Sequence, residues 1–103
     1  MGGIDPMHEY LKNQIHDEIK GAIDYLEKAL EYKSKSRDIA TKFFKMSEME
    51  VEHANCLTNM FNSVDKPTNV TDAEFSEMQK SVINDYVTSM GKIESMKKLY
   101  WSK

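Results

Sequence analysis

The chain has 103 residues, enough for one domain, and its 14 basic and 17 acidic residues give a net charge of -3. These charges are spread along the chain without a basic stripe, so we expect no nucleic-acid partner. No apolar run approaches the roughly 20 residues that cross a membrane, so we expect no membrane partner. Four Gly and two Pro among long stretches of helix-forming residues predict an all-α fold. A chain this short buries only about two-thirds of its surface on folding, which favours an oligomer.

The beginning of the chain has neither the basic nor the apolar region of a signal peptide. We interpret residues 1–6 as a cloning-derived segment in front of a native start at Met7, and residues 7–103 as a single helical domain. The single cysteine, Cys56, fits a reducing compartment, and we expect a cytoplasmic location. We expect Cys56 itself to be a small buried hydrophobic residue.

The first helix is predicted over residues 7–33, where mostly apolar residues recur at alternating steps of four and three. A second apolar row beside this one widens the stripe into the face of a bundle helix. We call the first row the inner row of this helix. It consists of Leu11, Ile15, Glu18, Ala22, Tyr25, Ala29 and Tyr32.

The second helix is predicted over residues 37–62 and repeats this stepping. Its inner row consists of Ile39, Phe43, Met46, Glu50, His53, Leu57, Met60 and Val64. The six polar residues 33–38 include two serines able to cap a new helix, which predicts an antiparallel helical hairpin. The rival prediction is one continuous coiled-coil helix of about 50 residues, because the heptad phase runs unbroken from Leu11 to Met60. We favour the hairpin because Ser36 would interrupt the apolar row of a continuous helix.

The third helix is predicted over residues 72–101. Thr71 and Glu74 have the spacing of a capping box, in which the two side chains satisfy free backbone amides reciprocally. Pro67 and Asn69 mark the loop before it. The apolar face of this helix comprises Phe75, Met78, Val82, Ile83, Tyr86, Val87, Met90, Ile93 and Met96.

Three potential metal ligands lie on the inner rows. Glu50 and His53 form a Glu-x-x-His motif, which places a carboxylate and an imidazole one turn apart on one helix face. This spacing alone has low specificity, since an exposed charged turn produces it as well. Glu18 holds a similar position in the first helix. A carboxylate in a core row is costly unless it is protonated, hydrogen-bonded or bound to a metal, so the placement predicts a metal site.

The length of the two hairpin arms brings these ligands together. A turn near Lys35 places Glu18 17 residues before it, and Glu50 and His53 15 and 18 residues after it. At about 1.5 Å per residue, all three fall within one helical turn of the same level. A continuous helix would instead separate Glu18 from Glu50 by about 48 Å, and one chain could not assemble the site.

Glu18 with Ala22 and Tyr25, followed by residues 48–54 (Glu-Met-Glu-Val-Glu-His-Ala), resembles the metal-binding half of the ferritin-like superfamily, especially rubrerythrin-type proteins. The resemblance covers about residues 11–57. In that superfamily, four helices hold two irons with a Glu from each of two helices and a Glu-x-x-His from each of the other two. This chain carries the set only once, so a single chain holds half a site.

We therefore expect a two-fold homodimer or a higher homo-oligomer, in which two hairpins form a ferritin-like four-helix bundle and the third helix covers that core or packs across the interface. Each chain then donates Glu18, Glu50 and His53. The encapsulated ferritins, short chains that build a ferroxidase site across a subunit interface, are similar in this respect. The similarity suggests an encapsulating protein shell as a candidate partner. The sequence shows no obvious targeting peptide that would support this partner.

Four carboxylates and two imidazoles per dimer, without a thiolate, suit iron or manganese. The resemblance implies two metal ions per dimer. The resemblance implies ferroxidase or related activity, the oxidation of Fe(II) by dioxygen or peroxide, with Glu18, Glu50 and His53 as catalytic and metal-binding residues. It implies that the two carboxylates bridge the metals and that the imidazole completes each coordination sphere. The alternative function is a metal-free structural or interaction oligomer of helical bundles, in which Glu50 and His53 bond to each other.

Tyr25 lies two turns from Glu18 on the inner row, and two roles remain open for it. It is either a hydrogen-bond donor to a metal ligand or a packed core tyrosine. His16 points to a different face from Glu18, and His8 lies at the start of the first helix, so we expect both to face solvent. The methionines at helical spacing are predicted to be adaptable core filling.

Overall fold

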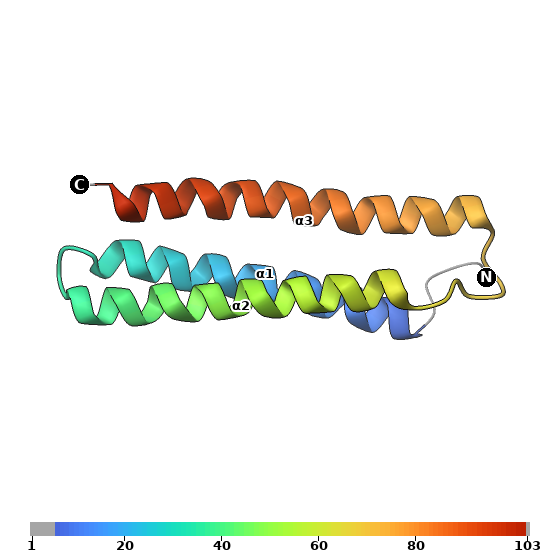
Figure 1. Ribbon diagram of the computed structural model, residues 1–103, viewed down its shortest axis with the longest axis horizontal. Coiled ribbons are helices and arrows are strands. Elements are labelled where there is room, and N and C mark those ends of the chain that lie inside the picture. The colour runs from blue at the N-terminus through green and yellow to red at the C-terminus, as the bar shows by residue number, and fades with distance from the viewer. Residues whose placement is uncertain (1–5, 103) are drawn as a thin grey trace.

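The computed structural model describes residues 6–102, which form three helices and no strand. The helices are α1 (Pro6–Tyr32), α2 (Arg37–Ser63) and α3 (Asp72–Trp101). Figure 1 shows α1 and α2 side by side as a hairpin, with α3 running along it. The predicted all-α class, with a hairpin followed by a third helix, is confirmed. Residues 1–5, which make up most of the segment interpreted as cloning-derived, lie outside the described part, and Pro6 begins α1.

The hairpin is confirmed and the continuous helix is wrong, because the chain reverses between Tyr32 and Arg37. The amide of Ser36 donates to the carbonyl of Tyr32 at 2.8 Å, which closes the turn. The extended backbone of Ser36 then lets its hydroxyl accept from the amide of Ile39 at 3.3 Å and cap α2. Ser36, the polar residue that interrupts the apolar row, therefore marks the start of α2.

The capping box at the start of α3 is also confirmed. The amide of Thr71 donates to the Glu74 carboxylate at 2.9 Å, and the amide of Glu74 donates to the Thr71 hydroxyl at 3.1 Å. The loop before α3 folds back on the bundle, since Pro67 and Val70 are buried. This loop and cap direct α3 along the hairpin.

The core lies between the hairpin and α3 and has two parts. Both parts combine residues from all three helices, so α3 completes a core that the hairpin alone leaves open. The part nearer the hairpin turn contains Ala22, Leu26, Ala29, Ala40, Phe44, Ile93 and Tyr100. The part nearer the start of α1 contains Leu11, Ile15, Ile19, Ala54, Phe61 and Val82.

The buried face of α2 differs from the predicted one. Each of its buried residues comes one position after a member of the inner row, and they are Ala40, Phe44, Ser47, Ala54 and Phe61. Three apolar members of the inner row itself are exposed: Ile39 at 41%, Met46 at 39% and Met60 at 47%. The prediction that the inner row of α2 is core is therefore wrong for these three residues, whereas Phe43, Leu57 and Val64 are half-buried and pack against the core. The hairpin and α3 cover one side of α2 and leave the inner row at the edge of that contact.

Two further expectations were wrong. His8 is fully buried, not solvent-facing, because α1 begins at Pro6 and its first turn places His8 between Phe61 and Phe75. The imidazole meets both rings edge-on, with centroids 5.1 Å and 5.2 Å away. Cys56 is exposed, because it lies two residues after buried Ala54, on the outer side of α2. In the described part of the chain, no helix combines the length and apolarity needed to cross a membrane.

Candidate metal centre

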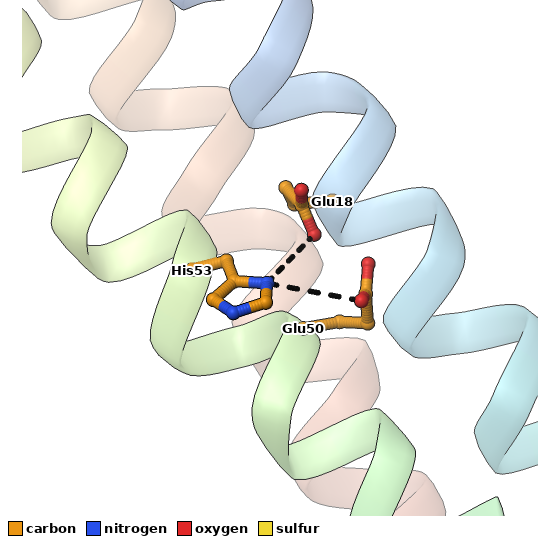
Figure 2. A group of neighbouring side chains, drawn as sticks. All are labelled: Glu18, Glu50 and His53. Carbon is orange, nitrogen blue, oxygen red and sulfur yellow. Dashed lines mark ion pairs between the residues drawn. The ribbon is translucent and has the colours of Figure 1, made fainter.

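The hairpin brings Glu18 of α1 together with Glu50 and His53 of α2. Each of these side chains offers one ligand atom, and the three atoms lie within 4.8 Å of one another. Figure 2 shows the two carboxylates and the imidazole converging between α1 and α2, with α3 behind the hairpin. The predicted register of the two arms therefore places all three residues at a common level.

The imidazole of His53 faces both carboxylates through the same ring nitrogen. His53 Nδ1 lies 3.5 Å from Glu18 Oε2 and 3.8 Å from Glu50 Oε1 (Figure 2). Both distances are longer than a hydrogen bond and within the range of an ion pair. Three electron-rich atoms thus face a common point without direct bonds joining His53 to the carboxylates.

Burial differs among the three side chains. Glu18 and Glu50 are 22% and 26% exposed, whereas His53 is 57% exposed. Glu18 Oε2 is itself buried and has no hydrogen-bond partner among residues 6–102. A buried carboxylate oxygen without a partner is unfavourable, and a cation bound at this point would satisfy it. The residues present therefore fit a metal ion.

The electrostatics of Glu50 agree with this geometry. A hydrogen bond with the Glu18 carboxyl raises the pKa of Glu50, and burial and the Glu18 charge act in the same direction. His53 opposes this shift. The raised pKa means that two carboxyl groups share a space that favours one negative charge over two. A divalent cation between them would remove the repulsion.

Tyr25 packs against an aromatic ring. It is half-buried and stacks on Phe43, with ring centroids 6.1 Å apart and an interplanar angle of 26°. This contact favours the packed tyrosine among the two roles that the sequence left open. His16 is exposed, as expected, and lines a small cavity of about 110 Å³ between α1 and α3 together with Asp85 and Tyr86.

Sequence reasoning missed two residues that support the site. Ser47, one turn before Glu50, is fully buried and donates a hydrogen bond of 2.7 Å to the carbonyl of Ala22. The sequence signal that could have identified Ser47 is its spacing, since it lies seven residues from both Ala40 and Ala54 on the buried face of α2. Gly21, one turn after Glu18, lies against the Glu50 carboxyl. Its signal is a glycine in the middle of a long helix.

A family model described as Rubrerythrin matches residues 9–99. The match extends well beyond residues 11–57, on which the resemblance in the sequence rests, and includes most of α3. Searches of curated proteins and of solved structures gave no match.

Proposed function

Because the chain belongs to the rubrerythrin family, we propose that it is a di-iron carboxylate protein that oxidises Fe(II), with its metal centre shared between two chains. The observation that carries this proposal is the convergence of Glu18, Glu50 and His53 around a buried carboxylate oxygen that has no hydrogen-bond partner among residues 6–102. Carboxylate oxygens with imidazole nitrogen suit iron or manganese.

The roles of the residues follow from their chemistry. Glu18 and Glu50 supply negative charge that offsets the charge of the cations, and His53 supplies a nitrogen ligand. Two Fe(II) ions held by these residues would supply two electrons, enough to reduce one hydrogen peroxide and two protons to two waters, or one dioxygen and two protons to hydrogen peroxide.

The surface around the site supports the sharing of two half-sites. Four residues of α2 follow one another at steps of seven and form one exposed row: Ile39, Met46, His53 and Met60. All four side chains are at least 39% exposed in the single chain. A second hairpin packed on this row would bury the apolar side chains and add a second set of ligands across a two-fold axis.

Iron binding tests the proposal. Protein purified aerobically with Fe(II) should contain about one iron per chain, as two irons per pair of chains require. Glu50→Ala should lose this iron and the accelerated formation of Fe(III), measured by absorbance after Fe(II) is added. Glu48→Ala is the matched control, because Glu48 is an exposed carboxylate outside the buried face of α2. This substitution should leave the iron content and the formation of Fe(III) unchanged.

A metal-free structural or interaction oligomer is the second candidate. The raised pKa of Glu50 favours it, since protonation of one of the two carboxyls also relieves their repulsion. Equal and negligible iron in the unmodified protein and in Glu50→Ala would favour this candidate and contradict the di-iron proposal.

A further inference from the structure

Gly21 of α1 faces the carboxyl group of Glu50. A Cβ placed on Gly21 would lie 2.9 Å from Glu50 Oε2, 3.6 Å from its Cδ and 3.8 Å from its Cγ. These are the three nearest atoms to that position outside the helix's own backbone, and all belong to one side chain. The missing side chain of Gly21 therefore leaves the space in which the Glu50 carboxyl lies.

The backbone of α1 does not require a glycine at this position. No glycine in the described part of the chain has a positive φ, and Gly21 lies in the interior of a regular helix. Alanine is more favourable than glycine in such a position because it loses less backbone entropy. Gly91 of α3 provides the comparison, since a Cβ placed there would meet nothing within 4 Å.

We propose that Gly21 is a positioning residue of the metal site, which seats the Glu50 carboxyl against α1 beside Glu18. This inference rests on the proposed metal-binding function. A side chain at Gly21 moves the carboxyl away from α1, because ordinary contacts begin at 3.4 Å and the present one is 2.9 Å. The required displacement of about 0.5 Å exceeds the tolerance of about 0.2 Å in metal–ligand distances.

The displacement acts on the ligand geometry and spares the fold. The atom in the way is the far end of a flexible side chain, so the carboxyl can rotate outward without moving either helix. Gly21→Ala should therefore fold at least as stably as the unmodified protein while holding metal less tightly. Gly91→Ala should share the stabilisation and leave metal binding unchanged, which makes it the matched control.

The experiment is a calorimetric titration of the metal-freed protein with Mn(II), with thermal unfolding measured alongside. We expect the unmodified protein and Gly91→Ala to bind with equal affinity, and Gly21→Ala to bind about 10 to 100 times more weakly, as for other supporting residues of metal sites. Thermal unfolding should show Gly21→Ala to be fully folded, so that its weaker binding reflects the site alone.

A shorter ligand distinguishes positioning from a general effect of alanine. Glu50→Asp withdraws the carboxyl from Gly21 by one methylene, so on its own it should weaken Mn(II) binding strongly. In a protein that already carries Gly21→Ala, the same Glu50→Asp substitution should weaken binding much less. Equal Mn(II) affinity in Gly21→Ala and Gly91→Ala, or strictly additive effects of Gly21→Ala and Glu50→Asp, would overturn the positioning role. Absence of Mn(II) and Fe(II) binding by the unmodified protein and by Gly91→Ala would instead overturn the proposed function, and this inference with it.

Discussion

The hydroxyl of Ser47 in α2 donates a 2.7 Å hydrogen bond to the carbonyl oxygen of Ala22 in α1, and both residues are fully buried. Ser47 precedes Glu50 by one turn, and Ala22 follows Glu18 by about one turn. The bond therefore links the two arms of the hairpin at the level where the metal ligands meet, and it fixes the register that brings Glu18 opposite Glu50.

Ser47→Ala should lower the free energy of unfolding by about 0.5–1.5 kcal/mol, because it removes a buried hydrogen bond between helices. Ser63→Ala is the control, since the Ser63 hydroxyl bonds the carbonyl of Asn59 within the same helix at an exposed position. The control should change the free energy by less than about 0.5 kcal/mol. Urea unfolding midpoints measure both, and equal midpoints for the two variants would show that the Ser47 bond does not stabilise the hairpin.

Two isoleucines of α3 test how this helix packs. Ile93 is fully buried against the hairpin, whereas Ile83 is 41% exposed. Ile93→Ala should cost about 2–5 kcal/mol because it leaves a cavity in the core, and Ile83→Ala should cost much less. Thermal or urea unfolding measures the difference. A comparable loss for both variants would contradict the orientation of α3 on the hairpin.

The stability of the metal-free protein should depend on pH through Glu50. Its pKa is raised in the folded chain by the Glu18 hydrogen bond, by burial and by the Glu18 charge, from an ordinary value of 4.5. Between these two pKa values the folded state binds more protons than the unfolded state. The contribution of Glu50 to stability is therefore full below about pH 4.5 and is lost as the pH rises through the folded pKa.

Glu50→Gln removes this dependence. In the presence of a chelator, it should unfold at a higher temperature than the unmodified protein at pH 7, and the difference should shrink as the pH is lowered to about 4. Thermal unfolding across this range checks the sign. A variant less stable than the unmodified protein at pH 7 would show that the two carboxyls do not repel each other in the folded chain.

Glu74 should show the opposite sign. Hydrogen bonds from the amide and hydroxyl of Thr71 lower the pKa of Glu74, so its stabilising contribution is present above pH 4.5 and is lost as the pH falls through the folded pKa. Glu74→Gln should therefore lower the unfolding temperature at pH 7 and have a smaller effect at low pH. An effect that grows as the pH falls would contradict the capping role of the ionised carboxylate.

Local signals in the sequence were sufficient for the helices and for the meeting of the ligands. The predicted bounds of the three helices lie within one residue of the observed ones, because Ser36, Thr71 and Glu74 form caps that depend on only a few neighbouring residues. The register of Glu18, Glu50 and His53 followed from the position of the turn and the fixed rise of a helix.

Features that depend on contacts between distant segments were not predictable in this way. Periodicity identifies an apolar face but does not say which of its residues the rest of the chain covers, and Ile39, Met46 and Met60 of the inner row of α2 are exposed. The burial of His8 depends on the loop that brings Phe75 beside Phe61. Gly21 and Ser47 have their roles only because the two arms of the hairpin approach closely.

The exposed row on α2 leads to a prediction about assembly. Met60 lies on this row near the end of α2, well away from Glu50, and is 47% exposed. Met60→Lys should convert a dimer to a monomer, because a charge buried in an apolar interface is costly, while a lysine near a helix C-terminus is favourable in the monomer. Sedimentation velocity should give twice the mass of one chain for the unmodified protein and the mass of one chain for this variant.

Val87→Lys provides the control for assembly. Val87 is 62% exposed on α3, and α3 lies behind the hairpin when the site is viewed from the front (Figure 2). The same charge at this position should leave the dimer intact. Met60→Lys should also hold less iron per chain than Val87→Lys, although it leaves Glu18, Glu50 and His53 unchanged, because each half-site needs the other. A monomeric Met60→Lys that retains full iron would show that one chain binds the metal alone, and a dimer lost equally in both variants would place the interface elsewhere.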